Sequence, residues 1–171
     1  SPMLNLDHNS AGFRRNWLVL GPFVSTEIYH DYTEYLNALD HDHLGGEAKL
    51  RPRANETATA ITQSGNSSST RTWAEYEAPG DYVEMYNAIN GETLSSLAYA
   101  FTYVYSPVAQ AVDVKFDGAD FIRVYLNGEE LVPGLNRNHQ NPLPDKNTVT
   151  LVDLNQGMKD RKSTRLNSSH L

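Results

Sequence analysis

Alternating apolar and polar residues divide the second half of the chain into short strands. Residues 98–105 form a dense run of aromatic and β-branched side chains that ends at Ser106 and Pro107, and residues 111–116 and 121–126 each alternate. Aromatic and β-branched residues favour a pleated, half-buried surface, and strict alternation turns one face inward and the other outward. The pattern therefore predicts three successive strands.

The dipeptide Asn127-Gly128 directly follows the third of these strands. Asn-Gly after an alternating run is the strongest short signal for a β-hairpin, because both residues accept the positive φ angles that its turn needs. Shorter apolar or alternating runs at residues 16–23, 72–77 and 148–154 predict further strands. Strands of this length, separated by turns and loops, favour an all-β sandwich.

The rest of the chain is less regular. Residues 1–15 are polar and irregular, as expected for a lead-in segment, and residues 63–70 are rich in Ser and predict an exposed loop. Within residues 28–39 the apolar positions recur at helical spacing, which predicts one short helix inside a long N-terminal loop.

Composition narrows the functional classes. The chain has 171 residues, no cysteine and a formal net charge of −7. This length suits one domain, and the absence of cysteine excludes disulfides and thiolate metal sites. The negative charge argues against nucleic acid or an anionic membrane as the main partner. No apolar run approaches the roughly 18 residues that a membrane span needs.

The last part of the chain differs from the domain before it. Residues 160–170 read DRKSTRLNSSH, which resembles the translation of a sequencing-adapter oligonucleotide. A disordered polar terminus would have the same composition. We therefore expect residues 160–171 to be a non-native, disordered tail. On this interpretation the β-sandwich of residues 16–159 lacks its closing strand.

Several motifs, in this order, resemble galactose-binding-like jelly-roll modules of secreted bacterial glycoside hydrolases and related exported proteins. They are the run at residues 17–23, the turn at 44–47, Trp73, the segment at 81–83, the strand at 98–107 and the hairpin at 124–128. The resemblance implies a jelly-roll β-sandwich that is secreted, periplasmic or on the bacterial cell surface. It also implies a non-catalytic carbohydrate-binding or accessory module, with a polysaccharide or glycan and neighbouring domains of the parent chain as partners. The alternative is a structural spacer without sugar binding.

Aromatic residues are the candidate sugar-binding groups, because Trp and Tyr rings stack on the apolar faces of sugars. Trp73 and Tyr76 lie on one predicted strand, but three residues apart they face opposite sides, so one of them is expected in the core. Arg123 and Tyr125 share a face and would form a pair that combines hydrogen bonding with stacking. Trp17 lies in an apolar run and is expected in the core.

Acidic and histidine residues raise three further hypotheses. Asp117 and Asp120 flank a tight loop that offers carboxylates to a structural Ca²⁺, although an ordinary turn would use the same residues. His41 and His43 would share a face on a strand and offer imidazoles to Zn²⁺, but the remaining ligand spacing is absent. No catalytic motif is present and no pair of acids is placed for glycosidase chemistry, so a hydrolase is the least favoured class. No cofactor is certain.

Overall fold

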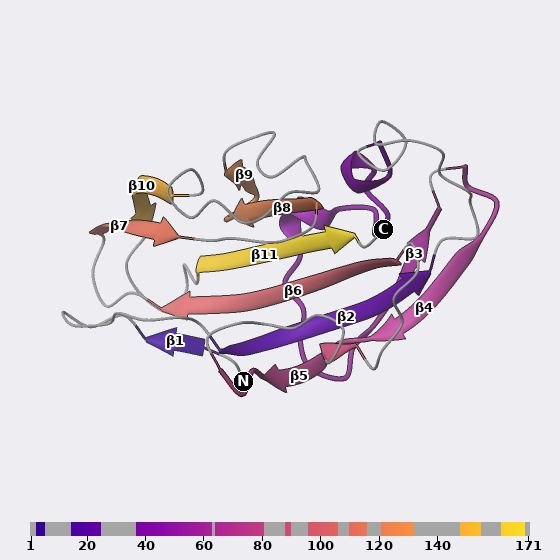
Figure 1. Ribbon diagram of the computed structural model, residues 1–171, viewed down its shortest axis with the longest axis horizontal. Coiled ribbons are helices and arrows are strands. Elements are labelled where there is room, and N and C mark those ends of the chain that lie inside the picture. The colour runs from indigo at the N-terminus through magenta and orange to yellow at the C-terminus, as the bar shows by residue number, and fades with distance from the viewer. Residues whose placement is uncertain are drawn as a thin grey trace.

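The computed structural model shows an all-β protein whose strands lie mostly in antiparallel sheets (Figure 1). It describes residues 3–5, 15–24, 37–62, 64–80, 88–89, 96–105, 110–115, 121–131, 148–154 and 162–169. The all-β class that the alternating pattern predicted is therefore confirmed at this level.

One large sheet carries most of the core. Its strands follow the order β5 (Ala74–Glu77), β2 (Asn16–Val24), β6 (Ser96–Tyr105), β11 (Lys162–Ser169), β8 (Phe121–Leu126) and β9 (Glu129–Leu131). β1 (Met3–Asn5) pairs in parallel with β6 outside this path. The long strands β2, β6 and β11 lie side by side across the centre of the sheet (Figure 1).

Two small sheets accompany the large one. β7 (Gln110–Lys115) pairs with β10 (Thr148–Leu154), and β3 (Thr57–Ile61) pairs with β4 (Ser68–Thr72). The loop that we predicted for residues 63–70 was wrong at residues 68–70, because these residues begin β4 and pair with β3 in a hairpin. The pattern hid this hairpin because its strands are mostly exposed and rich in Thr and Ser, so neither strand shows a continuous apolar face.

Local signals located the other elements well. The strand at residues 121–126 is β8, and the hairpin at Asn127-Gly128 is confirmed, with positive φ angles of 52° and 84° at its two turn residues. Residues 37–40 are helical, while residues 28–36 of the predicted helix lie outside the described part of the chain. A 3-10 helix, η1 (Glu47–Lys49), follows in the loop before β3.

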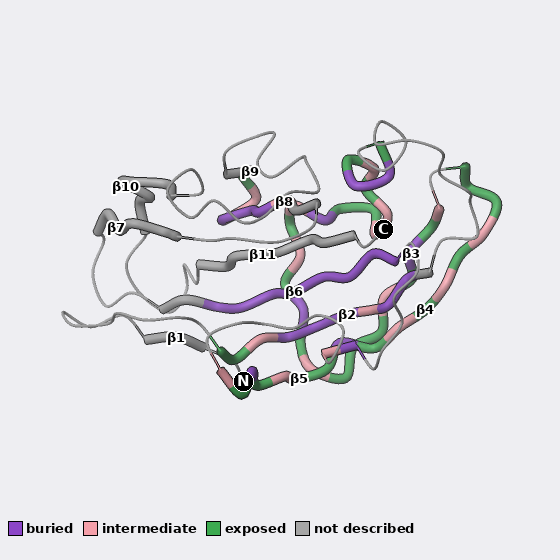
Figure 2. Tube along the Cα trace, viewed as in Figure 1, coloured by how far each residue is buried: buried purple, intermediate pink, exposed green. Residues whose placement is uncertain are grey.

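The buried residues are concentrated along β2 and β6 (Figure 2), and they form two clusters. One face of β6 joins a large cluster that includes Trp73 and Phe101, and the other joins a smaller cluster that includes Val19 and Ala100. Between Leu20 and Phe23 the register of β2 against β6 shifts. Gly21 lies in this shift with φ +140°, and a Cβ there would lie 3.1 Å from the Ala98 Cβ, so the strand needs glycine at this point.

The chain end differs from the sequence-based expectation. We expected residues 160–171 to be disordered, whereas residues 162–169 form β11, which pairs in antiparallel fashion with both β6 and β8. A prediction from composition considers only side chains. It does not take into account that two neighbouring strands can form backbone hydrogen bonds with a third strand of any sequence. β11 therefore occupies an internal position of the sheet despite its polar sequence.

Candidate functional site

Two aromatic residues are neighbours on β2 and on β5, the strand at one edge of the large sheet. The antiparallel register places Trp17 directly opposite Tyr76. Both side chains are partly buried and pack against the smaller core cluster, which includes Val19 and Ile89. Residues directly opposite each other on antiparallel strands share a face with Cβ atoms roughly 5 Å apart. Trp17 and Tyr76 are therefore two partly exposed aromatic residues on one face of the sheet, and we call them the aromatic pair.

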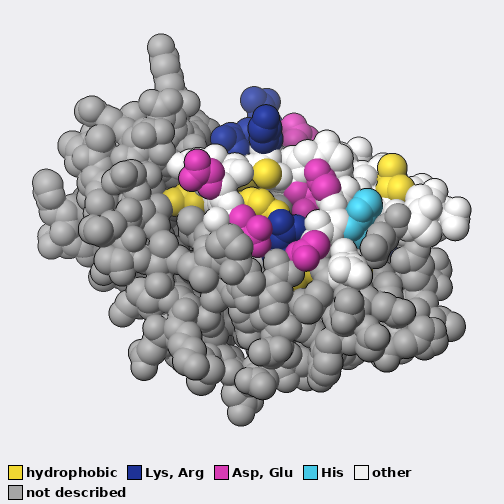
Figure 3. All heavy atoms as spheres, turned by 90° about the horizontal axis from the view of Figure 1, so that it is seen from above, with side chains coloured by type: hydrophobic (Ala, Val, Ile, Leu, Met, Phe, Trp, Pro, Cys, Tyr) yellow, Lys and Arg dark blue, Asp and Glu magenta, His cyan; other side chains and the backbone are white. Residues whose placement is uncertain are grey.

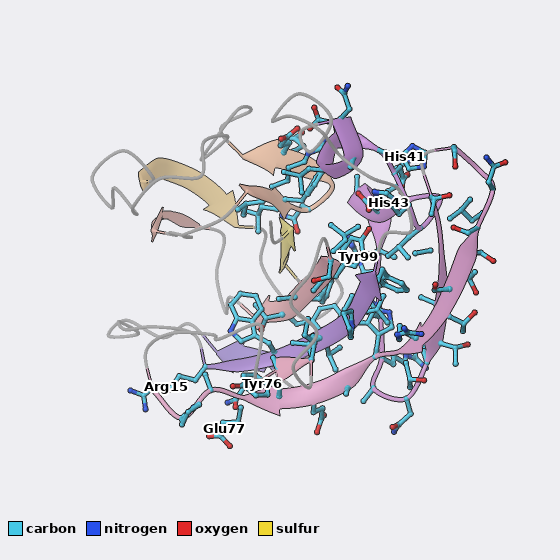
Figure 4. All side chains as sticks on the ribbon, turned by 45° about the vertical axis from the view of Figure 1, so that its right-hand side comes forward. Arg15, His41, His43, Tyr76, Glu77 and Tyr99 are labelled. Carbon is cyan, nitrogen blue, oxygen red and sulfur yellow. The ribbon has the colours of Figure 1, made fainter. Side chains whose placement is uncertain are left out.

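Charged residues lie close to the aromatic pair in the sequence. Arg15 is exposed just before β2, and its carbonyl accepts a hydrogen bond from the Ala78 N–H at 2.9 Å, which extends the ladder beyond the strand ends. Figure 4 shows Arg15, Tyr76 and Glu77 together at this end of β5. Glu77 is also exposed and lies opposite Asn16. Successive residues of a strand point to opposite faces, so the Glu77 side chain lies on the face opposite Tyr76 and only Arg15 is considered as a charged neighbour of the aromatic pair.

The sequence predicted only one member of the aromatic pair as a binding residue. Tyr76 was a candidate, but Trp17 was expected in the core because it begins an apolar run. In the structure Trp17 is only partly buried, while the next residues Leu18 and Val19 are fully covered. The pairing of Trp17 with Tyr76 depends on the register between distant strands, for which the sequence offers no local signal.

The other three candidate sugar-binding residues lie elsewhere and are enclosed. Trp73 is 2% exposed and meets Phe101 edge-to-face, with ring centroids 6.4 Å apart. Tyr125 is buried in β8, and the Arg123 guanidinium lies 5.1 Å from its ring centroid. The pair predicted from the alternation of β8 therefore forms, but it faces protein. Neither Trp73 nor Tyr125 presents a ring face to solvent.

Arg123 joins three segments of the fold. Its Nε and Nη2 donate to the two carboxylate oxygens of Glu130 in β9, at 3.2 and 3.0 Å, and Nη1 donates to the carbonyls of Leu39 and Asp40. Burial lowers the pKa of Arg123, but the hydrogen bond to Glu130 and the nearby charges together raise it above its usual value. On the face seen in Figure 3, acidic and basic side chains of the described residues are interspersed. We therefore interpret Arg123 as a residue that stabilises the fold and not as a ligand-binding residue.

His43 closes the loop that precedes η1. Its Nδ1 lies 3.0 Å from the Ile61 carbonyl oxygen and its Nε2 lies 2.5 Å from the Ala38 carbonyl oxygen. The His41 and His43 rings meet edge-to-face, 4.7 Å apart. Because both His43 nitrogens face carbonyls, this ring is not available as a zinc ligand.

Metal and acid hypotheses have little support among the described residues. No group of three or more His, Asp or Glu residues in this part of the chain is arranged to hold a metal ion. Asp117 and Asp120, proposed for Ca²⁺, lie outside the described residues. Glu75 and Glu77 are exposed, so these two do not form the buried acid pair that glycosidase chemistry would use.

Two tyrosine hydroxyls anchor the η1 loop to β6. The Tyr99 hydroxyl donates to the buried Glu47 carboxylate, and the Tyr103 hydroxyl donates to the Pro52 carbonyl at 3.0 Å. The Asp42 carboxylate accepts from the backbone N–H groups of Gly46 and Glu47 at 2.6 and 3.1 Å. Together these bonds fix the loop over one face of β6.

Removing the Tyr99 hydroxyl tests this anchor. In Tyr99→Phe the buried Glu47 carboxyl loses a donor, so we expect the free energy of unfolding to fall by about 1–3 kcal/mol. Urea unfolding followed by circular dichroism measures the change. Tyr103→Phe is the matched control, and it should cost less because its acceptor is an uncharged carbonyl. Equal stability of Tyr99→Phe and the unmodified protein would contradict the anchoring role.

Comparisons with known proteins give no relative from which to transfer a function. No family model matches the chain, and no curated protein or solved structure is significantly similar to it. Among the described residues, no helix has the length and apolar character to cross a membrane. The aromatic pair is therefore the strongest candidate site on physical grounds alone.

Proposed function

We propose that the protein is a non-catalytic carbohydrate-binding module and that the aromatic pair of Trp17 and Tyr76 is its sugar platform. One observation carries this proposal: two partly exposed aromatic residues lie directly opposite each other on β2 and on the edge strand β5. Sugar rings have apolar C–H faces, and aromatic side chains supply a large contact area together with a polar group. A rigid sheet holds such a platform in place before the ligand arrives.

The polar surroundings suit a hydroxylated ligand. The exposed Arg15 supplies hydrogen-bond donors at the same end of β5 as Tyr76 (Figure 4). Sugar hydroxyls both donate and accept, so the Arg15 guanidinium and the Tyr76 hydroxyl can orient a sugar stacked on the rings. The proposed ligand is a polysaccharide or glycan.

The finer assignment follows the order of the sequence motifs. We place the chain among galactose-binding-like jelly-roll modules, as an accessory part of a larger secreted bacterial protein such as a glycoside hydrolase. The support is the succession from the run at residues 17–23 to the hairpin at residues 124–128, together with the all-β fold.

Substitutions in the aromatic pair test sugar binding. Trp17→Leu and Tyr76→Leu remove a ring but keep an apolar residue on the strand, and each is expected to weaken binding about tenfold, or about 1.4 kcal/mol. Affinity electrophoresis through plant and algal polysaccharides measures retention. Ile61→Ala changes an exposed apolar residue outside the pair and should leave retention unchanged. Thermal melts confirm that the variants fold.

A spacer role is the second candidate. Trp73, Arg123 and Tyr125 all contribute to packing, which favours a purely structural use of these residues. If the unmodified protein is retained on no polysaccharide, the sugar-binding proposal fails and the spacer role stands. If retention persists unchanged in both Trp17→Leu and Tyr76→Leu, the aromatic pair is not the binding site.

A further inference from the structure

The position between β6 and β8 is filled by a strand that does not match its neighbours. β11 pairs with β6 along its whole length, from Lys162 opposite Val104 to Ser169 opposite Leu97, and with β8 from Thr164 to Ser169. Both ladders are antiparallel, so the backbone of β11 pairs on both of its edges. The mismatch lies in which residue types occupy each register position.

The face of β6 that joins the large core is aromatic and apolar. Leu97, Tyr99, Phe101 and Tyr103 recur at every second position of β6, and all four are buried in that cluster. The register sets four residues of β11 opposite them, and all four are polar: Ser169, Asn167, Arg165 and Ser163. Residues directly opposite each other share a face of the sheet, so β11 presents only polar residue types at the core-side positions.

The apolar position of β11 is not opposite the core-side residues of β6. Its one large apolar residue, Leu166, pairs with Ala100 and Val124 and therefore occupies the opposite face. On the core side, Arg165 pairs with Tyr125 as well as with Phe101. A strand with period-two alternation fits only when its apolar residues fall on the buried face. The backbone of β11 pairs with both neighbouring strands, but its sequence places polar residue types at the register positions opposite the apolar and aromatic residues of β6.

The two strands on either side of β11, β6 and β8, each pair with another strand as well. β6 is paired with β2 along its opposite edge, from Leu18 opposite Phe101 to Val24 opposite Ser96. β8 is paired with β9, and Arg123 ties it to the carbonyls of Leu39 and Asp40. β6 and β8 thus keep partners when β11 leaves.

We propose that the position between β6 and β8 is a strand-binding site for an extended peptide with apolar residues at alternate positions, and that β11 is its displaceable occupant. Main-chain hydrogen bonds supply affinity in strand addition of this kind, and alternate side chains supply specificity. A second copy of this chain is not the favoured partner, because an exchanged β11 would bring the same polar residues. A foreign strand with Val at the four core-side positions would match the buried face of β6.

Peptide competition with the full chain tests this site. The probe is the fluorescently labelled octapeptide Lys-Val-Thr-Val-Thr-Val-Thr-Val, as long as β11. The control peptide has the same composition with its valines in adjacent pairs, which removes the alternation. Fluorescence anisotropy should show at least tenfold tighter binding of the alternating peptide. Equal binding of the two peptides, or binding of neither, would overturn the proposal.

A variant with a better-fitting β11 locates the binding. Replacing Ser163, Arg165 and Asn167 by Val supplies the missing apolar residues from within the chain, so this variant should melt at a higher temperature and bind the alternating peptide at least tenfold more weakly. Hydrogen exchange provides a local readout, since the bound peptide should slow exchange in β6 and β8 of the unmodified protein. Unchanged peptide affinity in the variant would place the binding elsewhere and refute the site.

Discussion

Replacing Trp73 by Ala is expected to lower the free energy of unfolding by about 3–5 kcal/mol. The indole is 2% exposed and packs edge-to-face on Phe101 in the large core cluster. Its backbone is fixed as well, because its N–H donates to the Glu56 carbonyl and its carbonyl accepts from the Asn55 N–H, both at 2.8 Å. The surroundings therefore cannot collapse easily into the space that the ring leaves, and the cavity cost adds to the lost burial.

Urea unfolding followed by far-ultraviolet circular dichroism measures this effect. Trp17→Ala is the matched control, since the same side chain is removed from a partly exposed position and should cost less than half as much. Trp73→Phe keeps most of the ring and should retain polysaccharide binding if Trp17 and Tyr76 form the platform. A Trp73→Ala variant no less stable than Trp17→Ala would contradict the larger contribution of Trp73 to the core.

Replacing Arg123 by Leu is expected to lower the free energy of unfolding by about 2 kcal/mol. The side chain is 14% exposed and its Glu130 partner 21%, so this ion pair is shielded more than a surface pair. The change also removes the donors to the carbonyls of Leu39 and Asp40 and the contact with the Tyr125 ring. The helical turn at residues 37–40 should loosen from β8 as a result.

A lysine substitution separates geometry from charge. Arg123→Lys keeps the positive charge but lacks the planar fork that contacts both Glu130 oxygens and two carbonyls, so it should recover less than half of the lost stability. Chemical unfolding quantifies both variants, and hydrogen exchange of residues 37–40 reports the local loosening. Full stability of Arg123→Lys would mean that charge alone matters at this position.

Much of the strand layout follows from local sequence. The alternation in residues 121–126 and the dipeptide Asn127-Gly128 predicted β8 and its hairpin, because side-chain period and turn chemistry act over a few residues. The hairpin of β3 and β4 was not found, since its Thr- and Ser-rich strands are held by backbone pairing and by contacts such as that between the Thr59 and Thr70 hydroxyls, at 2.8 Å.

The candidate site was predicted less well than the strands. Alternation correctly placed Arg123 and Tyr125 on one face, but it did not show that the turn at residues 37–40 covers that face. It also separated Trp73 from Tyr76 without deciding which of them enters the core. Whether a face is buried depends on segments distant in sequence, so residue type alone selected one member of the aromatic pair and three packing residues.

The sequence by itself determined the all-β class, the location of several strands, the Asn127-Gly128 turn and which residues along a strand share a face. These properties depend on backbone sterics and on side-chain alternation over a few residues. Only the tertiary structure decided that Trp17 lies beside Tyr76, that Trp73 is enclosed and that β11 lies between β6 and β8. Strand neighbours and register are set by long-range backbone pairing and by burial of whole faces, which leave no mark in any short stretch of sequence.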